Sequence, residues 1–260
     1  MTHSIHPAAQ KGFSQAARLY QEVRPSYPKQ VIDWLRNDLN LSQSSYVVDL
    51  GTGTGKFLPY LQALTSHITA VEPVAEMLAE LEKRYPGVVA LPGTAQHLPL
   101  GNESQDAVLC AQSFHWFADI QSLNEIYEVL KPAGYLGLVW NQRDIEIEWV
   151  RALAELIAPF EGTTPRYHSG HWKEVFDNQF LFQLEKVKVL SQVQKGTVEQ
   201  VVSKRLLSTS FIAAMSESQQ QALKQQFEET VRHYTNKQPH DEIEFPYVTY
   251  AYSFKKVSYK

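Results

Sequence analysis

The chain has 260 residues, a formal net charge of −4 and 43% hydrophobic residues, which suits one large domain or a core domain with a modest extension. Its net charge is negative and its Asp and Glu residues are spread along the chain, so nothing in the charge favours nucleic acid or an anionic membrane as a partner. The single cysteine, Cys110, excludes an internal disulfide and a cysteine-rich zinc site.

The N-terminal stretch lacks a basic region followed by an apolar one, so it does not resemble a secretory signal. No apolar run approaches the roughly 18 residues of a membrane span. Cys110 lies inside an apolar run, as a buried and inert thiol would. We expect a cytoplasmic protein, monomeric or homodimeric, without a membrane or nucleic-acid partner.

The first 142 residues predict an α/β architecture. Two helices come first, with a stop at Arg24–Pro25 and a restart at about Pro28. Strands are then expected at 45–50, 67–73, 88–95, 106–113 and 134–141. Helices are expected between them at 55–64, 74–86 and 120–130. Strands rich in Val, Ile and Leu that alternate with helices are typical of a parallel sheet covered on both faces. Right-handed crossovers then give a Rossmann-like, doubly wound layout.

After residue 142 the alternation of strands and helices becomes less regular. A helix is expected at 147–160, a polar connection at 161–176, and strands at 180–194 and 245–257. Two further helices are expected to begin at capping boxes, formed by Thr197 with Gln200 and by Ser216 with Gln219. Because no helix pattern separates the last strands in the βαβ manner, an antiparallel edge is expected. Lys255 and Lys256 near the end are expected on the surface.

Three alternating glycines follow the first strand directly, in the stretch from Gly51 to Gly55. In a parallel α/β sheet, ligands bind at the carboxyl ends of the strands, and glycine lets a ligand lie against the backbone. The helix that follows offers free N–H groups to an anionic group. Glu72 ends the next strand, 21 positions after Gly51, where an acid accepts hydrogen bonds from ribose hydroxyls. The pattern predicts a nucleoside-containing cofactor; the alternative is a tight turn with Glu72 as a helix cap.

The spacing of the glycines argues against a nicotinamide dinucleotide. Such a site favours G-x-G-x-x-G, whereas this loop reads G-x-G-x-G and is followed by Phe57. The stretches "VVDLGTGTGKF", "VEP", "GTAQHLPL" and "EVLKPAGYLGLVWN" resemble the class I S-adenosylmethionine-dependent methyltransferases. The stretches "YQEVRPSYP" and "AQSFHWF" further resemble the small-molecule branch that includes trans-aconitate methyltransferases. The resemblance covers about residues 13–141, and the C-terminal part matches that branch only loosely.

The resemblance implies which residues contact S-adenosylmethionine. The glycine loop would hold the methionine part, and Glu72 would hold the ribose. Thr94 and Ala95 would flank the adenine, although many family members have Asp at position 94. An N-terminal segment would fold over the cofactor, and its Arg24 could pair with the carboxylate. The implied cofactor-binding residues are Tyr20, Arg24, Asp49, Gly51, Thr52, Gly53, Gly55, Glu72, Pro73, Thr94, Ala95, Gln112 and Trp116.

The segment from Phe114 to Phe117 follows the fourth strand, at the mouth of the sheet. A carboxylate acceptor needs no general base, whereas an alcohol or an amine needs its proton removed. His115 could be that catalytic base or a donor to the substrate, and Trp116 could lie along the adenine or face the sulfonium. The alternative is that these aromatic rings only pack the loop onto the sheet.

Other candidate residues lie in the C-terminal part. Arg166 or Arg205 could bind a substrate carboxylate, or Arg205 could lie on a solvated helix face. His168 and His171 lack a partnering Cys or acid at ligand spacing, so no metal site is expected.

The expected fold is a seven-stranded, mostly parallel sheet with helices on both faces, an N-terminal helical lid and C-terminal insertions that cover the substrate. The expected parts are a lid over residues 1–42, a cofactor-binding core over 43–142 and a C-terminal part over 143–260. The expected activity is S-adenosylmethionine-dependent methylation of a small-molecule acceptor, with carboxyl O-methylation suggested by the resemblance. The alternatives are a cofactor-binding protein without turnover and a nicotinamide-dependent oxidoreductase.

Overall fold

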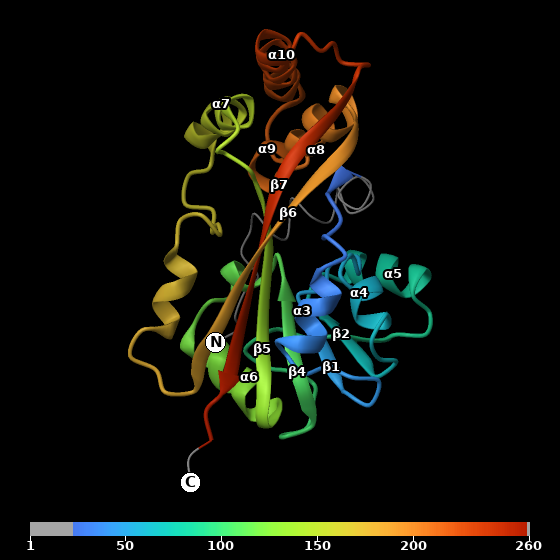
Figure 1. Cartoon of the computed structure of the whole chain (residues 1–260), viewed down its shortest axis with the longest axis vertical. Coiled ribbons are helices and arrows are strands. Elements are labelled where there is room, and N and C mark those ends of the chain that lie inside the picture. The colour runs from blue at the N-terminus through green and yellow to red at the C-terminus, as the bar shows by residue number, and fades with distance from the viewer. Residues whose placement is uncertain (1–22, 259–260) are drawn as a thin grey trace.

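A computed structural model describes residues 23–258 of the chain. At its centre lies a seven-stranded sheet with the order β3-β2-β1-β4-β5-β7-β6 (Figure 1). The strands are β1 (Val47–Leu50), β2 (Ile68–Glu72), β3 (Val89–Pro92), β4 (Gln105–Ala111), β5 (Leu130–Arg143), β6 (Phe182–Thr197) and β7 (Glu242–Lys256). The first five pair in parallel, and β7 lies antiparallel between β5 and β6. The predicted Rossmann-like sheet and its antiparallel edge are therefore confirmed.

The described helices connect these strands and extend beyond them. The α-helices are α3 (Val31–Asn37), α4 (Leu58–Gln62), α5 (Ala75–Arg84), α6 (Ile120–Val129), α7 (Glu148–Ile157), α8 (Arg205–Leu207), α9 (Ser210–Ala213) and α10 (Glu217–Thr235). Short 3₁₀ segments are η1 (Phe114–Trp116), η2 (Ala158–Phe160) and η3 (His171–Phe176), and η4 (Glu199–Lys204) is a π-helical turn. In the part of the chain that the structure describes, no helix combines the length and apolar character that a bilayer crossing requires.

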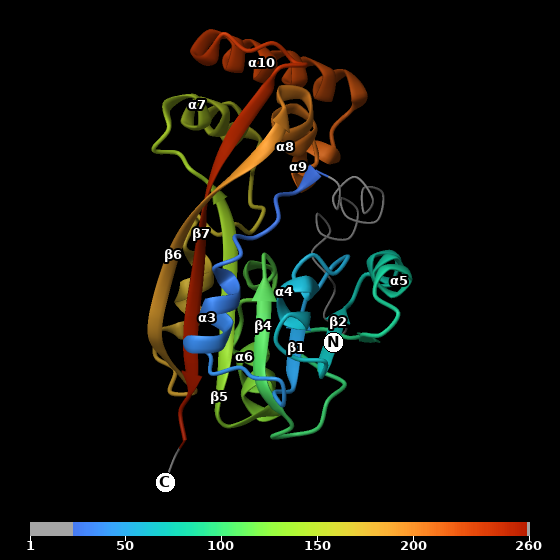
Figure 2. The same ribbon diagram turned by 45° about the vertical axis from the view of Figure 1, so that its right-hand side comes forward.

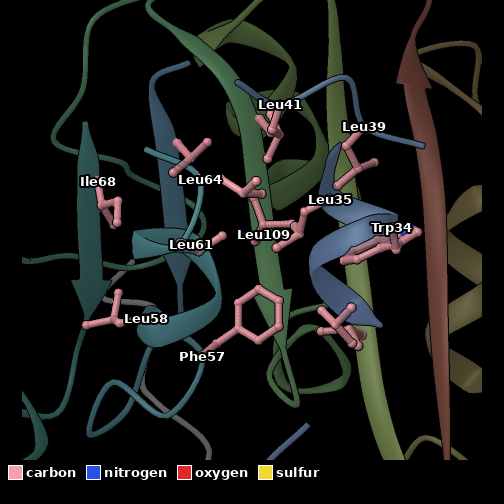
Figure 3. Packing of buried hydrophobic residues seen from close by; sticks show 14 of the residues in the cluster. Trp34, Leu35, Leu39, Leu41, Phe57, Leu58, Leu61, Leu64, Ile68 and Leu109 are labelled. Carbon is pink, nitrogen blue, oxygen red and sulfur yellow. The ribbon is translucent and has the colours of Figure 1, made fainter. Parts of the chain in front are cut away.

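One face of the sheet is covered by α3, α4 and α5, as Figure 2 shows. Figure 3 shows the apolar side chains that fill this layer, with Trp34 and Leu35 from α3 facing the same layer as Leu58 and Leu61 from α4. Trp34 is fully buried, and its indole Nε1 donates a hydrogen bond to Ser253 Oγ of β7 at 2.9 Å. This bond ties the N-terminal part of the chain to its last strand.

The placement of α3 refines the expected N-terminal lid over residues 1–42. Within the described part of that range, α3 packs onto the sheet as a core helix. Just before it, Arg24, Pro25 and Tyr27 line a cavity at the edge of the sheet. The helix begins at Val31 rather than at about Pro28, because Lys29 and Gln30 form a turn.

The opposite face of the sheet is covered by α6, η1 and η3. Buried residues of this second layer include Leu123 and Ile126 of α6 and Trp172 of η3. Trp172 packs 4.5 Å from Trp140 of β5, measured between ring centroids. The segment 161–176, predicted as a polar connection, therefore supplies part of the core through η3. Cys110 is buried in this layer, as expected.

A third apolar cluster joins α7, η4, α8, α9 and α10 to the beginning of β7. We call these five helical elements, with the connections between η4 and α10, the cap. Figure 1 shows the cap beyond the end of the sheet where β5 leads into α7. The long strands β6 and β7 carry the chain from the sheet into the cap and back. The C-terminal part of the chain thus contributes both to the sheet and to the cap.

Two local predictions were wrong. The sequence of α5 suggests a buried side formed by Ala75, Leu78, Ala79 and Leu81. The buried residues are instead Met77, Leu78 and Leu81, whereas Ala75 and Ala79 are exposed, because the helix turns its longer apolar side chains toward the sheet. Lys256 is buried rather than on the surface. Its Nζ donates to the Leu130 carbonyl at 2.6 Å and lies 4.2 Å from the centroid of the Tyr127 ring.

Candidate functional site

The turn after β1 is built from glycines in left-handed backbone conformations. Gly51 has φ +66° and Gly53 has φ +57°, a region that residues with a Cβ adopt rarely. A Cβ at Gly51 would lie 2.6 Å from Ser113 Cβ, so this position also needs glycine for space. The loop therefore lies directly against the end of β4, at the carboxyl edge of the sheet.

Glu72 at the end of β2 is tied to this loop. Its Oε2 accepts a hydrogen bond from Gly53 N at 2.8 Å, and its Oε1 accepts one from Val74 N at 3.0 Å. Burial raises the pKa of Glu72 to about 7, although both backbone hydrogen bonds act in the opposite direction. A carboxylate has about four lone-pair sites, so Glu72 can still accept hydrogen bonds from a ligand.

Asp49 lies beneath the loop and is fully buried. Its Oδ2 accepts a hydrogen bond from Thr52 Oγ1 at 2.6 Å, whereas its Oδ1 has no hydrogen-bond partner among the described residues. Burial raises the pKa of Asp49 to about 7, the Thr52 bond opposes this shift, and the charge of Glu72 adds to it. The charge of Glu72 therefore disfavours the ionised form of Asp49.

The glycine loop and Glu72 border a cavity of about 510 Å³, a volume that suits a small-molecule or cofactor site. It lies at the carboxyl edge of the sheet, and it is also lined by residues of the segment before α3 and by Arg205 of the cap. Among the predicted cofactor residues, those that line it are Arg24, Gly51, Thr52, Gly53, Glu72, Pro73, Thr94, Ala95, Gln112 and Trp116. The structure thus brings together residues that lie up to 92 positions apart in the sequence.

Three predicted site residues do not line this cavity, and a fourth, Tyr20, lies outside the described residues. Asp49 lies one layer below the loop. Gly55, with φ +81°, faces the protein interior, where a Cβ would lie 2.8 Å from atoms of Leu58 and Tyr85. Gly55 is therefore required for packing beneath the loop.

His115 is the third, and its position does not suit a catalytic base. Its Nδ1 accepts a hydrogen bond from Trp140 Nε1 at 3.0 Å, and its ring packs between Trp116 and Trp140. Burial lowers the pKa of His115 to about 3, and the positive charges of Arg166 and Arg24 lower it further. A histidine with this pKa is neutral at physiological pH and a weak proton acceptor. These contacts fit the other role considered for the segment from Phe114 to Phe117, which is packing of the loop onto the sheet.

Gln112 has a backbone conformation that is unusual for a residue with a side chain. Its φ is +60°, and its Nε2 donates to the Asn141 carbonyl at 3.0 Å. A non-glycine residue in this region costs roughly 1–3 kcal/mol and often marks a functional position. The strained turn directs the chain from β4 into η1 beside the cavity.

Sequence reasoning missed several lining residues, among them Lys56, Asp119 and Asn141. Asn141 belongs to β5 near its carboxyl end, where a polar residue in an apolar strand was a usable signal. Its Nδ2 donates to the Ser26 carbonyl at 3.1 Å, and its Oδ1 accepts from Thr249 Oγ1 at 2.6 Å. Asp119 caps α6 by accepting from Ser122 N at 2.7 Å, and it also accepts from Gln96 Nε2 at 2.8 Å.

Cationic side chains gather where the cavity meets the cap. Arg24, Lys56 and Arg205 line the cavity, and Arg143 and Arg166 lie close by. Burial lowers the pKa of Lys56 to about 8, with added effects from the charges of Arg205, Arg24 and Arg84. Arg205 is only 8% exposed, so the solvated helix face considered for it is wrong.

The described residues contain no group of three or more His, Cys, Asp or Glu side chains placed to hold a metal ion. His168, one of the two histidines considered as ligands, instead pairs its Nε2 with Glu161 Oε2 at 2.9 Å.

The residues present fit S-adenosylmethionine, the cofactor that the resemblance implies. Glu72 faces the cavity from the strand end where a ribose-binding acid is expected. The left-handed glycines leave the backbone of the loop bare, and only Met77 Sδ lies within 4 Å of a Cβ built on Gly53, at 3.6 Å.

Comparison with known proteins points the same way. Residues 48–138 match the model of a family described as a methyltransferase domain. An uncharacterized methyltransferase-like protein of Schizosaccharomyces pombe is 35% identical over 249 residues, which are 95% of this chain and 96% of that protein. An uncharacterized methyltransferase of Mycobacterium tuberculosis is 37% identical over 214 residues, which are 76% of this chain and 86% of that protein.

Solved structures share the fold at low sequence identity. One, described as a type II methyltransferase from Anaeromyxobacter dehalogenans, has a TM-score of 0.64 and 18% identity, and the match covers 89% of this chain and 96% of that chain. The [4+2]-cyclase SpnF has a TM-score of 0.57 and 14% identity, and the match covers 96% of each chain. Because a cyclase shares this fold, the fold alone does not define the reaction.

Proposed function

Because the chain belongs to the class I S-adenosylmethionine-dependent methyltransferases, we propose that it methylates a carboxyl oxygen of a small-molecule acid. The observation that carries this proposal is the state of the ionisable groups around the cavity. Among the described residues, each group that could remove a proton is assigned to the cofactor, is engaged in structural hydrogen bonds or is protonated at neutral pH, and a carboxylate acceptor needs no such group.

Within residues 23–258, the acidic side chains that line the cavity are Glu72 and Asp119, and both are engaged in structural hydrogen bonds. Glu72 accepts from two backbone N–H groups, and Asp119 accepts from Ser122 N and Gln96 Nε2. Lys56, with a pKa of about 8, is mostly protonated at neutral pH. His115 lies outside the lining and is bonded to Trp140. An alcohol or an amine acceptor would need a proton removed, and a carboxylate already carries its nucleophilic oxygen at neutral pH.

When bound, S-adenosylmethionine supplies an electrophilic methyl group on a sulfonium. The task left to the protein is to hold the acceptor oxygen in line with that group and to exclude water. Orientation of this kind supplies roughly 7–11 kcal/mol of a reaction barrier. The glycine loop and Glu72 would hold the cofactor from the sheet edge. Arg24 and Arg205 would close the cavity from the segment before α3 and from the cap.

Two relatives support an acid as the acceptor. Proteins named malonyl-[acyl-carrier protein] O-methyltransferase from Marinomonas and Erwinia billingiae are each 31% identical to part of this chain, over 132 and 93 residues. Their name describes methylation of a malonyl group. They match 48% and 35% of this chain, in agreement with a shared cofactor-binding half and a different acceptor.

The test is incubation with methyl-labelled S-adenosylmethionine and a panel of small organic acids. We expect labelled methyl esters, which release the label as methanol on treatment with base. A product that keeps its label in base would show transfer to another kind of atom and would contradict the proposal. Binding of S-adenosylhomocysteine without transfer to any acceptor would favour the alternative of a binding protein without turnover.

A calorimetric titration tests the remaining alternative, a nicotinamide-dependent oxidoreductase. We expect S-adenosylhomocysteine to bind and NADH not to bind, since the loop lacks the third glycine of a dinucleotide site. Binding of NADH alone would point to hydride transfer.

A further inference from the structure

The two edges of the sheet differ in their protection against pairing with another strand. At one edge, β3 has four residues and ends at Pro92, whose ring nitrogen cannot donate a hydrogen bond. Short strands and prolines are common devices that block such pairing. At the other edge, β6 has sixteen residues and no proline, and within residues 23–258 it pairs with β7 alone. Its outer row of backbone N–H and C=O groups therefore offers a template for a further strand.

One face of β6 carries a row of apolar side chains that remain half-exposed. Leu184, Val187, Val189 and Val193 are 48%, 42%, 57% and 45% exposed. The β7 residues opposite the first three pack into the layer that contains η3, and Val193 follows with the same alternation. The four side chains therefore share one face of the sheet. A contiguous apolar row of this kind favours cover by another apolar surface.

The lysines of β6 do not protect its edge. Lysine side chains commonly oppose edge pairing because their charges repel a second strand. Here Lys186 Nζ lies 2.7 Å from Asp38 Oδ1, and Lys188 Nζ lies 3.9 Å from Asp38 Oδ2. Lys195 Nζ lies 2.7 Å from Glu244 Oε1. The charges of these lysines are thus compensated within the same chain.

We propose that β6 pairs with β6 of a second copy of this chain in antiparallel orientation, so that one sheet runs through a homodimer. Such an interface requires a surface that complements itself about a two-fold axis. β6 meets this requirement with the axis at Leu190. Val187 then lies opposite Val193 of the second copy, and each lysine of the stretch 186–194 lies opposite a glutamine. This inference does not depend on the proposed acceptor.

Other positions of the axis create conflicts between side chains that face each other. An axis at Lys188 would place that lysine opposite its own copy, and like charges directly opposite each other destabilise a strand pair. An axis at Ser191 would place Val187 opposite Lys195. The axis at Leu190 avoids both conflicts. A strand of another protein could use the same backbone groups, but the self-complementary order of side chains favours the second copy.

Sedimentation equilibrium of the full chain over a range of concentrations tests the pairing. We expect the mass of two chains at high concentration. Val187→Lys alone and Val193→Glu alone each place a charge opposite a valine twice in the dimer, and each should weaken it about tenfold or more. Val89→Lys is the matched control, because it changes a valine of similar exposure (57%) on the opposite edge strand β3. It should leave dimerisation unchanged.

The double variant Val187→Lys/Val193→Glu tests the register. Its two substituted positions lie roughly 20 Å apart along one strand, so their opposite charges meet only across the interface. We expect it to dimerise with nearly wild-type affinity. Loss of the dimer in the single variants without recovery in the double variant would overturn the antiparallel pairing about Leu190. Binding of S-adenosylhomocysteine checks that each variant is folded, because none of the substituted positions lines the cofactor cavity.

The wild-type protein also decides the question without any variant. Amide hydrogen exchange in β6 should slow as the protein concentration rises, because pairing protects the outer backbone groups. The mass of one chain at every concentration would overturn the proposal and leave this edge to a strand of another protein. A dimer that both single variants keep would place the interface elsewhere and would equally contradict it.

Discussion

Glu72 connects the two structural features that define the cofactor side of the cavity. Its carboxylate accepts one hydrogen bond from the glycine loop and one from the start of α5, so it fixes the loop relative to β2. A single side chain thus shapes the loop and faces the cavity. Removing it should affect cofactor binding through both roles.

We expect Glu72→Ala to weaken S-adenosylhomocysteine binding at least tenfold. A hydrogen bond to a charged group contributes roughly 1.5–3 kcal/mol, and the loop also loses the acceptor of Gly53 N. Calorimetric titration measures the change. Glu82→Ala removes an exposed carboxylate from α5 and serves as the control. Wild-type affinity in Glu72→Ala would contradict a ribose contact at this residue.

The raised pKa values of Asp49 and Glu72 predict a pH dependence of cofactor binding. Both lie near 7 because burial disfavours the charged carboxylates. An acid whose pKa is higher in the folded chain takes up a proton on folding, so the pair destabilises the free protein as pH rises from about 4 toward about 7. Ribose hydroxyls donate to a carboxylate and favour its charged form. Cofactor affinity should therefore rise between pH 6 and pH 8, by about tenfold for one coupled proton.

Titrations of S-adenosylhomocysteine at several pH values test this dependence, and Glu72→Gln is the matching variant because it cannot titrate at that position. We expect a much flatter profile for the variant. Affinity that falls as pH rises from 6 to 8 would have the wrong sign for a ligand that donates to these carboxylates.

For single residues, the sequence predicted where a residue lies in the fold better than it predicted what the residue does there. Glu72 and Gly53 lie where spacing and strand ends placed them, because those signals depend on local chain geometry. Gly55 and His115 have the expected residue types beside the cavity, yet their surroundings give them packing roles. The partner that occupies His115 is Trp140 of β5, 25 positions away, and no local pattern reveals it. Roles that depend on such long-range contacts need the structure.

At the scale of elements, the start of α10 shows how local chemistry fixes a boundary. Ser216 Oγ accepts from Gln219 N at 3.4 Å, and Gln219 Oε1 accepts from Ser216 N at 3.1 Å, which forms the predicted capping box. The same reciprocal pair forms between Thr197 and Gln200. There it leads into the π-helical η4 instead of a regular helix, because tertiary packing in the cap decides the winding.

We expect Ser216→Ala to destabilise α10 and with it the cap. Losing an N-cap side chain costs about 1 kcal/mol, which corresponds to a fall in Tm of roughly 2–4 °C for a chain of this size. Thermal unfolding followed by circular dichroism measures the shift. Gln221→Ala changes an exposed residue inside the same helix and should leave Tm unchanged or slightly higher. An equal effect of the two substitutions would show that the capping box does not stabilise the helix.

At the scale of the whole molecule, the order of strands and helices along the chain was predictable, and the assembly of the cap was not. The periods of the apolar pattern are local, so β1 to β5 and their helices follow from the sequence. The cap instead buries Leu153 of α7 against Val202 of η4, Phe227 of α10 and Phe245 of β7. These contacts join segments that no repeat or motif pairs in advance, and they bring Arg205 to the cavity.

Since the cap has an apolar cluster of its own, we propose that it loosens without unfolding the cofactor-binding core over residues 43–142. Phe227→Ala removes a fully buried ring of this cluster, a change that costs roughly 3–5 kcal/mol. We expect faster amide hydrogen exchange in α7 and α10 and unchanged exchange in β1 and β4. Binding of S-adenosylhomocysteine should stay near the wild-type value. Tyr234→Ala, which removes an exposed ring from α10, is the control. If exchange rises equally in β1 and β4 of the Phe227 variant, the cap and the core unfold as one unit, which would contradict the proposed independence of the cap.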